Sequence, residues 1–303
     1  MRVTNKMIAT NTLYNLNRNL SRMAKTNNQI STGKRINRPS DDPISTAKAL
    51  RLRADVSEIE QYTRNTEDAL SWLNITESAV DNLEEIIHKA RELAVRGATE
   101  SFSEDDREVI ADEIRQLRAQ ILNVGNSTYL GRHIFSGFQT DRPLFQQNGT
   151  YNIDTSAPDT KILRYQIGVG EEMDIGVFGL NIFGGAGGAP GAASEIIEDF
   201  DNLILALDGD DTPNISAFIG DIDGHLDNVL SIRSEIGAKT NRLELIRNRL
   251  EENDIDFTDL LNKNENVDMA ETFMNLQMEK SVYTASLSAG AQILQPTLID
   301  FIR

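Results

Sequence analysis

The sequence contains no cysteine, which excludes a disulfide scaffold, a zinc site held by thiolates and a cysteine nucleophile. Aromatic residues make up 6% of the 303 residues, and there is a single tryptophan. Hydrophobic residues reach 39%, and no apolar run approaches the roughly 18 residues that a membrane span needs. This composition favours an elongated, helix-rich chain with much solvated surface.

Positive charge is scarce overall, with 30 Lys and Arg against 47 Asp and Glu, but it is concentrated at the start of the chain. Residues 1–53 contain eleven Lys and Arg and two acids, a net charge of +9, so residues 54–303 carry −26. A basic arm suggests nucleic acid or an anionic membrane as a partner. However, Tyr14 is the only aromatic residue in the first helical segment, and the arm presents a hydrophobic seam that a phosphate backbone could not use. We expect neither partner, and a basic-arm binding protein stays a remote alternative.

No motif in the sequence indicates catalysis or a bound metal or cofactor. The three histidines (His88, His133 and His225) are scattered without metal-ligand spacing. The TGKR at 32–35 lacks the glycine spacing of a phosphate loop, and the acidic stretch at 207–214 departs from a calcium loop after its first two ligand positions. We therefore expect no enzyme activity, no cofactor and no metal, and we interpret 207–214 as a helix-terminating turn.

Both ends of the chain show apolar residues three or four positions apart, the heptad pattern of a coiled-coil seam. The seam of the first helix contains Leu13, Leu16, Leu20, Met23 and Ile30, and that of the last contains Phe273, Leu276, Tyr283, Leu287, Leu294 and Phe301. Asn27 and Lys280 interrupt the seams, so each helix is marginal alone and should order only when a partner covers it. We expect the two ends to pair with each other and these residues to form an assembly interface.

The middle of the chain combines long helical patterns with one β-rich stretch. A 3/4-spaced apolar track runs from 59 to 94, and further helical patterns cover 110–124, 194–207 and 222–262. Residues 137–193 are rich in β-forming residues and turn signals, and end in a glycine-rich segment at 184–193 that we interpret as a flexible linker.

This order predicts a mainly α fold with a β-rich insertion (α+β). We expect an elongated rod of long antiparallel helices, coiled-coil termini and a small β domain at the tip. The predicted domains are a terminal assembly domain (1–45 with 265–303), a helical rod (46–136 with 194–264) and the β-rich insertion (137–193).

The segment RINRPSDDP, residues 35–43, joins the first helix to the long second one. Asp42 followed by Pro43 has the pattern of an N-cap with proline at the first helical position. The segment is either a capped turn or an inter-subunit contact in which Arg35 and Arg38 face acidic neighbours. We include both arginines, together with Asp41 and Asp42, in the predicted assembly interface.

The chain resembles the bacterial flagellin superfamily in GKRINRPSDDP at 33–43 and in the C-terminal pattern VDMAE…LQ…Y.ASL. The resemblance covers about 1–136 and 222–303 and leaves the β-rich insertion uncovered. Within the family, NSTYLGRHIFSGF at 126–138 and the final QPTLIDFIR are more similar to the branch that joins hook to filament than to filament subunits.

The resemblance implies a structural subunit of the flagellum, exported unfolded without a cleaved signal, whose terminal helices fold on assembly. The implied location is extracellular, at the hook–filament junction. The implied partners are other copies of the chain, hook-associated protein 1, flagellin and a flagellar export chaperone. A filament flagellin is the alternative.

Overall fold

The structure is a computed structural model that describes all residues except 1–4, 100–103, 157–162, 186, 210 and 294–303. The chain divides into two compact units. We call Met1–Glu58 with Asn253–Arg303 the terminal unit, and Ile59–Glu252 the central unit. The three predicted domains remain a prediction.

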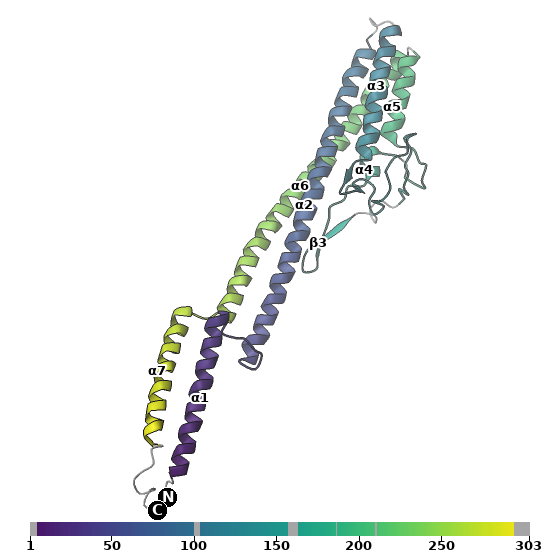
Figure 1. Cartoon of the computed structure of the whole chain (residues 1–303). Helices are drawn as coiled ribbons and strands as arrows, with labels where there is room; N and C mark the ends of the chain where they lie inside the picture. Colours follow the sequence, from purple (N-terminus) through teal and green to yellow (C-terminus); the bar gives the residue numbers. More distant parts are fainter. Residues whose placement is uncertain (1–4, 100–103, 157–162, 186, 210, 294–303) are drawn as a thin grey trace, which may run out of the picture. The chain divides into compact units, whose positions relative to one another are not determined.

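The terminal unit holds the two ends of the chain side by side. Helix α1 (Asn5–Thr32) packs along α7 (Met269–Ile293), as the sequence predicts for the two ends (Figure 1). The unit also contains the start of α2 (Pro43–Gly97) and the end of α6 (Thr212–Glu265). Helix α2 begins at Pro43 because the Asp42 carboxylate accepts a hydrogen bond from the Ser45 backbone N–H at 3.1 Å, which confirms the predicted cap.

In the central unit, α2 and α6 run antiparallel. Arg91 pairs with Asp223 at 2.6 Å and Arg233 with Asp81 at 2.7 Å, so positions later in α2 meet positions earlier in α6. The predicted apolar track from 59 to 94 is buried along its length, apart from the half-buried Tyr62. Thr66 and Thr76 are buried in this track, and their hydroxyls are not left without a partner. Each donates a hydrogen bond to the carbonyl four residues earlier, at 2.8 Å.

Two shorter helices, α3 (Glu104–Gly125) and α5 (Glu195–Asp208), pack against each other and thicken the central unit into a helical bundle. The predicted face of α3 is buried throughout, from Ile110 to Val124. Helix α6 begins ten residues before the predicted 222, because Asp211 accepts hydrogen bonds from Asn214 and caps the helix there. Asp208 and Asp211 thus belong to a helix-terminating turn, as predicted.

The β-rich insertion is confirmed, although its strands are short. Strands β1 (Thr128–Tyr129) and β2 (Arg132–His133) form one antiparallel hairpin, which lies before the predicted insertion, in the part of the chain predicted as rod. Strands β3 (Arg164–Gly168) and β4 (Glu171–Asp174) form another hairpin, within the predicted insertion. The first hairpin turns at Leu130 and Gly131, which both have positive φ (50° and 77°), the requirement of a tight two-residue turn. Phe135, Phe145, Tyr151 and Phe183 form an aromatic core beside them.

The insertion differs from expectation in three details. It lies against the side of the central helices, where Asn65 donates to the Gln166 carbonyl at 2.7 Å and Arg242 pairs with Glu171 at 2.9 Å. The tip of the central unit is instead formed by the end of α2 at Gly97, the start of α3 at Glu104, the end of α5 at Asp208 and the start of α6 at Thr212. Residues 179–183 form a short helix, α4 (Gly179–Phe183), which buries Ile182 and Phe183.

The third difference concerns the glycine-rich segment at 184–193, which is not a free linker where the structure describes it. Gly191 donates to the Tyr151 carbonyl at 2.8 Å, and Tyr151 donates back to the Ala192 carbonyl at 2.9 Å. Positive φ values at Gly185 and Gly191 allow this tight folding.

Candidate assembly interface

The α1–α7 pair has an inner face that is only partly apolar. The pair brings together Leu16, Met23 and Ile30 from α1 with Leu276 and Tyr283 from α7, all half-buried or buried. Between them lie small and polar groups, among them the buried Thr26 and Thr272. Asn19 donates to the Ser286 hydroxyl at 3.2 Å across the pair.

The remaining predicted seam residues lie on the outside of the pair. Leu13 and Leu20 are 55% and 42% exposed, and Phe273 and Leu287 are 54% and 44% exposed. At every second predicted seam position, the residue that faces the partner helix is the one before the predicted residue. Asn19, for example, faces inward in place of Leu20. Leu294 and Phe301, also predicted for the interface, lie outside the described residues.

Glycine explains why the helices can pack on such small side chains. A Cβ atom built on Gly290 would lie 3.1 Å from the Thr12 methyl group, tighter than ordinary contact. The helices approach closely at this point, and the larger apolar side chains are left to the outer surface.

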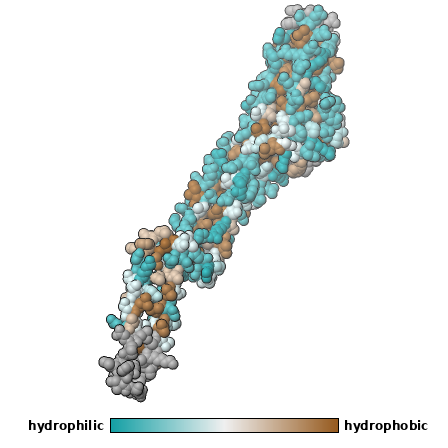
Figure 2. Space-filling model, viewed as in Figure 1, coloured by the Kyte–Doolittle hydropathy of each residue, from teal (hydrophilic) through white to brown (hydrophobic). Residues whose placement is uncertain are grey.

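We call the exposed apolar residues of α1 and α7 the outer track. Besides Leu13, Leu20, Phe273 and Leu287 it contains Met7, Tyr14, Met274, Met278 and Val282, each at least 44% exposed. Figure 2 shows hydrophobic atoms on the visible face of this pair. The heptad pattern did not include these five residues, although apolar residues beside a seam can indicate a second apolar face of the helix. A surface of this kind is typical of a helix face that a protein partner covers.

A buried acid, Glu265, holds the α1–α2 loop against the end of α6. Its side chain is 6% exposed and accepts from Lys34 Nζ at 2.6 Å and from the Arg53 guanidinium. Burial opposes ionisation, but the hydrogen bonds from Lys34 and Arg53 outweigh it and lower the pKa of Glu265. Nothing in the sequence marks this residue, because its partners lie more than 200 positions away.

The predicted loop residues have distinct surroundings in the structure. The Arg35 backbone N–H donates to the Glu265 carbonyl at 2.7 Å and its guanidinium to the Asn264 carbonyl at 2.9 Å. The Asp41 carboxylate accepts from the Arg38 backbone N–H at 3.0 Å and closes the turn. Hydrogen bonds from Ser45 lower the pKa of Asp42. These contacts fit the capped-turn interpretation, while the Arg38 guanidinium has no partner among the described residues.

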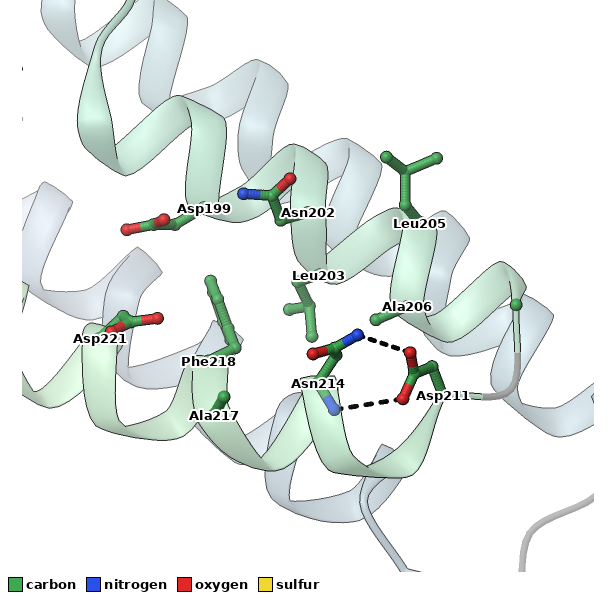
Figure 3. A pocket seen from close by; sticks show the side chains of 11 residues that line it. Asp199, Asn202, Leu203, Leu205, Ala206, Asp211, Asn214, Ala217, Phe218 and Asp221 are labelled. Carbon is green, nitrogen blue, oxygen red and sulfur yellow. Dashed lines mark hydrogen bonds between the residues drawn. The ribbon is translucent and has the colours of Figure 1, made fainter.

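An open groove with an acidic rim lies between α5 and α6 in the central unit (Figure 3). Asp199, Asp211 and Asp221 lie along it, with Leu203 and Phe218 beneath. The Asp199 carboxylate pairs with His225 Nε2 at 2.7 Å, and the Asp211 carboxylate accepts a hydrogen bond from the Asn214 side chain. The Asp199–His225 contact therefore links α5 to α6, whereas Asp211 caps the start of α6.

Within the described ranges, no cluster of three or more His, Cys, Asp or Glu residues is arranged to hold a metal ion. In the part of the chain that the structure describes, no helix has both the length and the apolar character that crossing a membrane requires.

Comparison with known proteins matches both helical parts of the chain to one family. Residues 3–140 match the bacterial flagellin N-terminal helical region, and residues 219–302 match the bacterial flagellin C-terminal helical region. The chain belongs to the bacterial flagellin family, a family of flagellar structural proteins.

Relatives of the chain include both hook-associated proteins and flagellins. The chain is 29% identical to flagellar hook-associated protein 3 of Escherichia coli, over 95% of this chain and 96% of that protein. It is also 29% identical to the flagellin of Bacillus subtilis, over 97% of each.

Solved structures of flagellar proteins share the fold. A protein assigned as a flagellar hook-associated protein of Vibrio parahaemolyticus aligns with a TM-score of 0.66 at 25% identity, over 75% of this chain and 100% of that chain. The flagellar junction protein FlgL of Legionella pneumophila aligns with a TM-score of 0.56 at 18% identity, over 74% of this chain and 100% of that chain. The mainly α fold with a small β insertion is thus shared with these proteins.

Proposed function

We propose that the chain is the adapter subunit that joins the hook of the bacterial flagellum to its filament. The observation that carries the proposal is the outer track, because a family of assembling subunits needs apolar surface that neighbouring copies can bury. Fully burying one leucine side chain contributes about 1.5–3 kcal/mol, so covering several partly exposed apolar residues per copy favours association of the copies. The predicted interface residues on both faces of the α1–α7 pair act in this assembly.

Coupled folding and assembly explains why the inner face is so polar. A pair held by Thr, Asn, Ser and Gly contacts is weak in the free chain, which keeps the termini soluble and compatible with export in an unfolded state. Covering the outer track in the assembled tube then stabilises the pair. The partners of the adapter are further copies, hook-associated protein 1 and flagellin, with an export chaperone before secretion to the extracellular junction.

A strain that lacks this chain tests the proposal. We expect hooks without filaments and monomeric flagellin released into the medium, because filament growth has no adapter on which to start. Hooks without filaments and without released flagellin would identify the chain as the filament subunit instead. Normal filaments would contradict both.

A matched pair of variants in the complemented strain links this function to the outer track. Leu20→Asp places a charge on the outer track and should abolish filament formation. Asn17→Asp adds the same charge to another exposed position of α1 and should restore filaments. If both variants restored filaments equally, the outer track would not be needed for assembly.

A further inference from the structure

Two exposed charged stripes in the terminal unit have no partners in their own chain. Lys48 and Arg51 lie three residues apart near the start of α2, and Asp256 and Asp259 lie three apart near the end of α6. All four side chains are exposed, and none has an ion pair or hydrogen bond among the described residues. Residues three apart share one face of a helix, so each stripe presents two like charges in a row.

Each stripe also carries exposed apolar surface. Ile44, one turn before Lys48, is 84% exposed, and Ile255 and Leu260, beside the two aspartates, are 65% and 47% exposed. Neither stripe is part of the buried surface of its helix, which uses Ala49 and Leu52 in α2. The two stripes thus have the same spacing, combine charged with apolar side chains, and carry opposite charge.

We propose that the start of α2 in one copy docks antiparallel on the end of α6 in a neighbouring copy, with Lys48 opposite Asp259 and Arg51 opposite Asp256. The occupant is a second copy because the complementary charges occur on the same chain at the same spacing. The contact uses two different surfaces, so it repeats from copy to copy and can close a ring or build a tube. It rests on the proposed function, because it needs copies side by side.

The antiparallel direction follows from the fold. Helices α2 and α6 run in opposite directions within one chain, as Arg91–Asp223 and Arg233–Asp81 show. Copies that all point the same way along a tube therefore present α2 and α6 to each other in opposite directions.

The register that pairs the charges also matches their neighbours. It places Leu260 opposite the small Ala47, and it places Lys263 opposite Ile44, where the aliphatic part of the lysine can cover the isoleucine. One turn further, Asp55 would face Glu252, and this like-charge pair ends the contact. Exposed ion pairs contribute little affinity, so the stripes chiefly select the neighbour and its register, while the outer track holds the assembly.

Cysteine cross-linking tests the contact directly, because the chain has no cysteine of its own. Flagella are isolated from a strain that produces the Lys48→Cys/Asp259→Cys variant, and they are exposed to a mild oxidant. We expect a ladder of disulfide-linked multimers, and the same for Arg51→Cys/Asp256→Cys. Lys48→Cys with Glu252→Cys is the matched control. Its cysteines would be offset by seven residues, about 10 Å along the helix, beyond the reach of a disulfide, so no ladder should form.

Co-expression of the two single variants, Lys48→Cys and Asp259→Cys, should give dimers and no longer products, which shows that the link joins different copies. Filaments without any 48–259 link would overturn the contact and leave the proposed function intact. Where a cysteine variant fails to assemble, charge reversal gives a second measurement. Lys48→Glu/Arg51→Glu should reduce the number of filaments per cell, and adding Asp256→Lys/Asp259→Lys to the same chain should restore it. Failure of this restoration would contradict the contact.

Discussion

The two units of the chain place their apolar residues in opposite ways. In the central unit the heptad positions of α2 are buried within the chain, and Leu73 and Leu83 have no exposed surface. In the terminal unit the close contact between α1 and α7 is made in part by threonine, asparagine and glycine, while Leu13 and Phe273 are more than half exposed. The apolar track of α2 is thus buried within a single copy, whereas the α1–α7 pair leaves an apolar face that other copies can cover.

This contrast is tested most strongly by the same substitution in both units. Leu83→Ala removes a fully buried side chain and should lower the free energy of unfolding of the central unit by about 2–5 kcal/mol. Leu20→Ala should lower the stability of the free chain by about 0.5 kcal/mol, yet impair filament formation. Urea denaturation followed by circular dichroism gives both stabilities. Equal destabilisation by the two variants would contradict the division.

The buried acid Glu265 predicts that the stability of the terminal unit depends on pH in the acid range. Because its pKa is lowered in the folded chain, its ionised form stabilises the fold at neutral pH. This stabilisation is lost as the pH falls below about 4.3, the ordinary pKa of glutamate, and through the lowered value. Glu265→Gln should cost about 1.5–3 kcal/mol at pH 7 and flatten the acid dependence of the terminal unit. Hydrogen exchange of the α1–α2 loop, measured from pH 7 to pH 3, resolves the effect. An unchanged acid dependence in the variant would contradict the assignment.

A larger residue at Gly290 should separate the two terminal helices. Gly290→Leu forces a side chain against Thr12 and should destabilise the pair by about 1–3 kcal/mol while the central unit melts as before. Ala289→Leu, at an exposed neighbouring position, is the control and should leave the pair unchanged. The helicity of the free chain reports both, and loss of helicity in the control alone would be the opposite of this expectation.

The smallest effect is expected from the surface ion pairs of the central unit. Arg233 contacts Asp81 at 2.7 Å and Glu84 at 2.8 Å, but its side chain is 36% exposed. Arg233→Gln should therefore lower the unfolding free energy only slightly. A larger loss in thermal unfolding would show that the central unit depends on charge pairs as well as on its apolar core.

Sequence periodicity could predict the long helix of the central unit because its apolar pattern is compatible with burying only one helix face. The track from 59 to 94 is apolar or threonine almost throughout, and only one face of α2 can be buried. The short helix α4 and the early start of α6 were not predictable in the same way. They depend on tertiary burial of Ile182 and Phe183 and on a cap formed by Asp211.

The candidate interface could be predicted only in part. Heptad spacing identified Leu16, Met23 and Leu276 on the inner face, but it also assigned Leu20 and Leu287 to the same seam. Which of two neighbouring residues faces inward depends on how closely the two helices approach. That distance is set by the contact between Gly290 and Thr12, which the sequence alone does not reveal. The Glu265 contacts join residues that are distant in the sequence, so no local pattern could reveal them.

The central claim is that neighbouring copies cover the outer track, and labelling of single cysteines tests it most directly. Leu20→Cys and Leu287→Cys are treated with a maleimide reagent, once in the free chain and once in isolated flagella, and denatured flagella give full labelling as the reference. We predict rapid labelling of both positions in the free chain and protection of both in flagella. Equal labelling in the two states would show that the outer track stays exposed after assembly and would contradict the account.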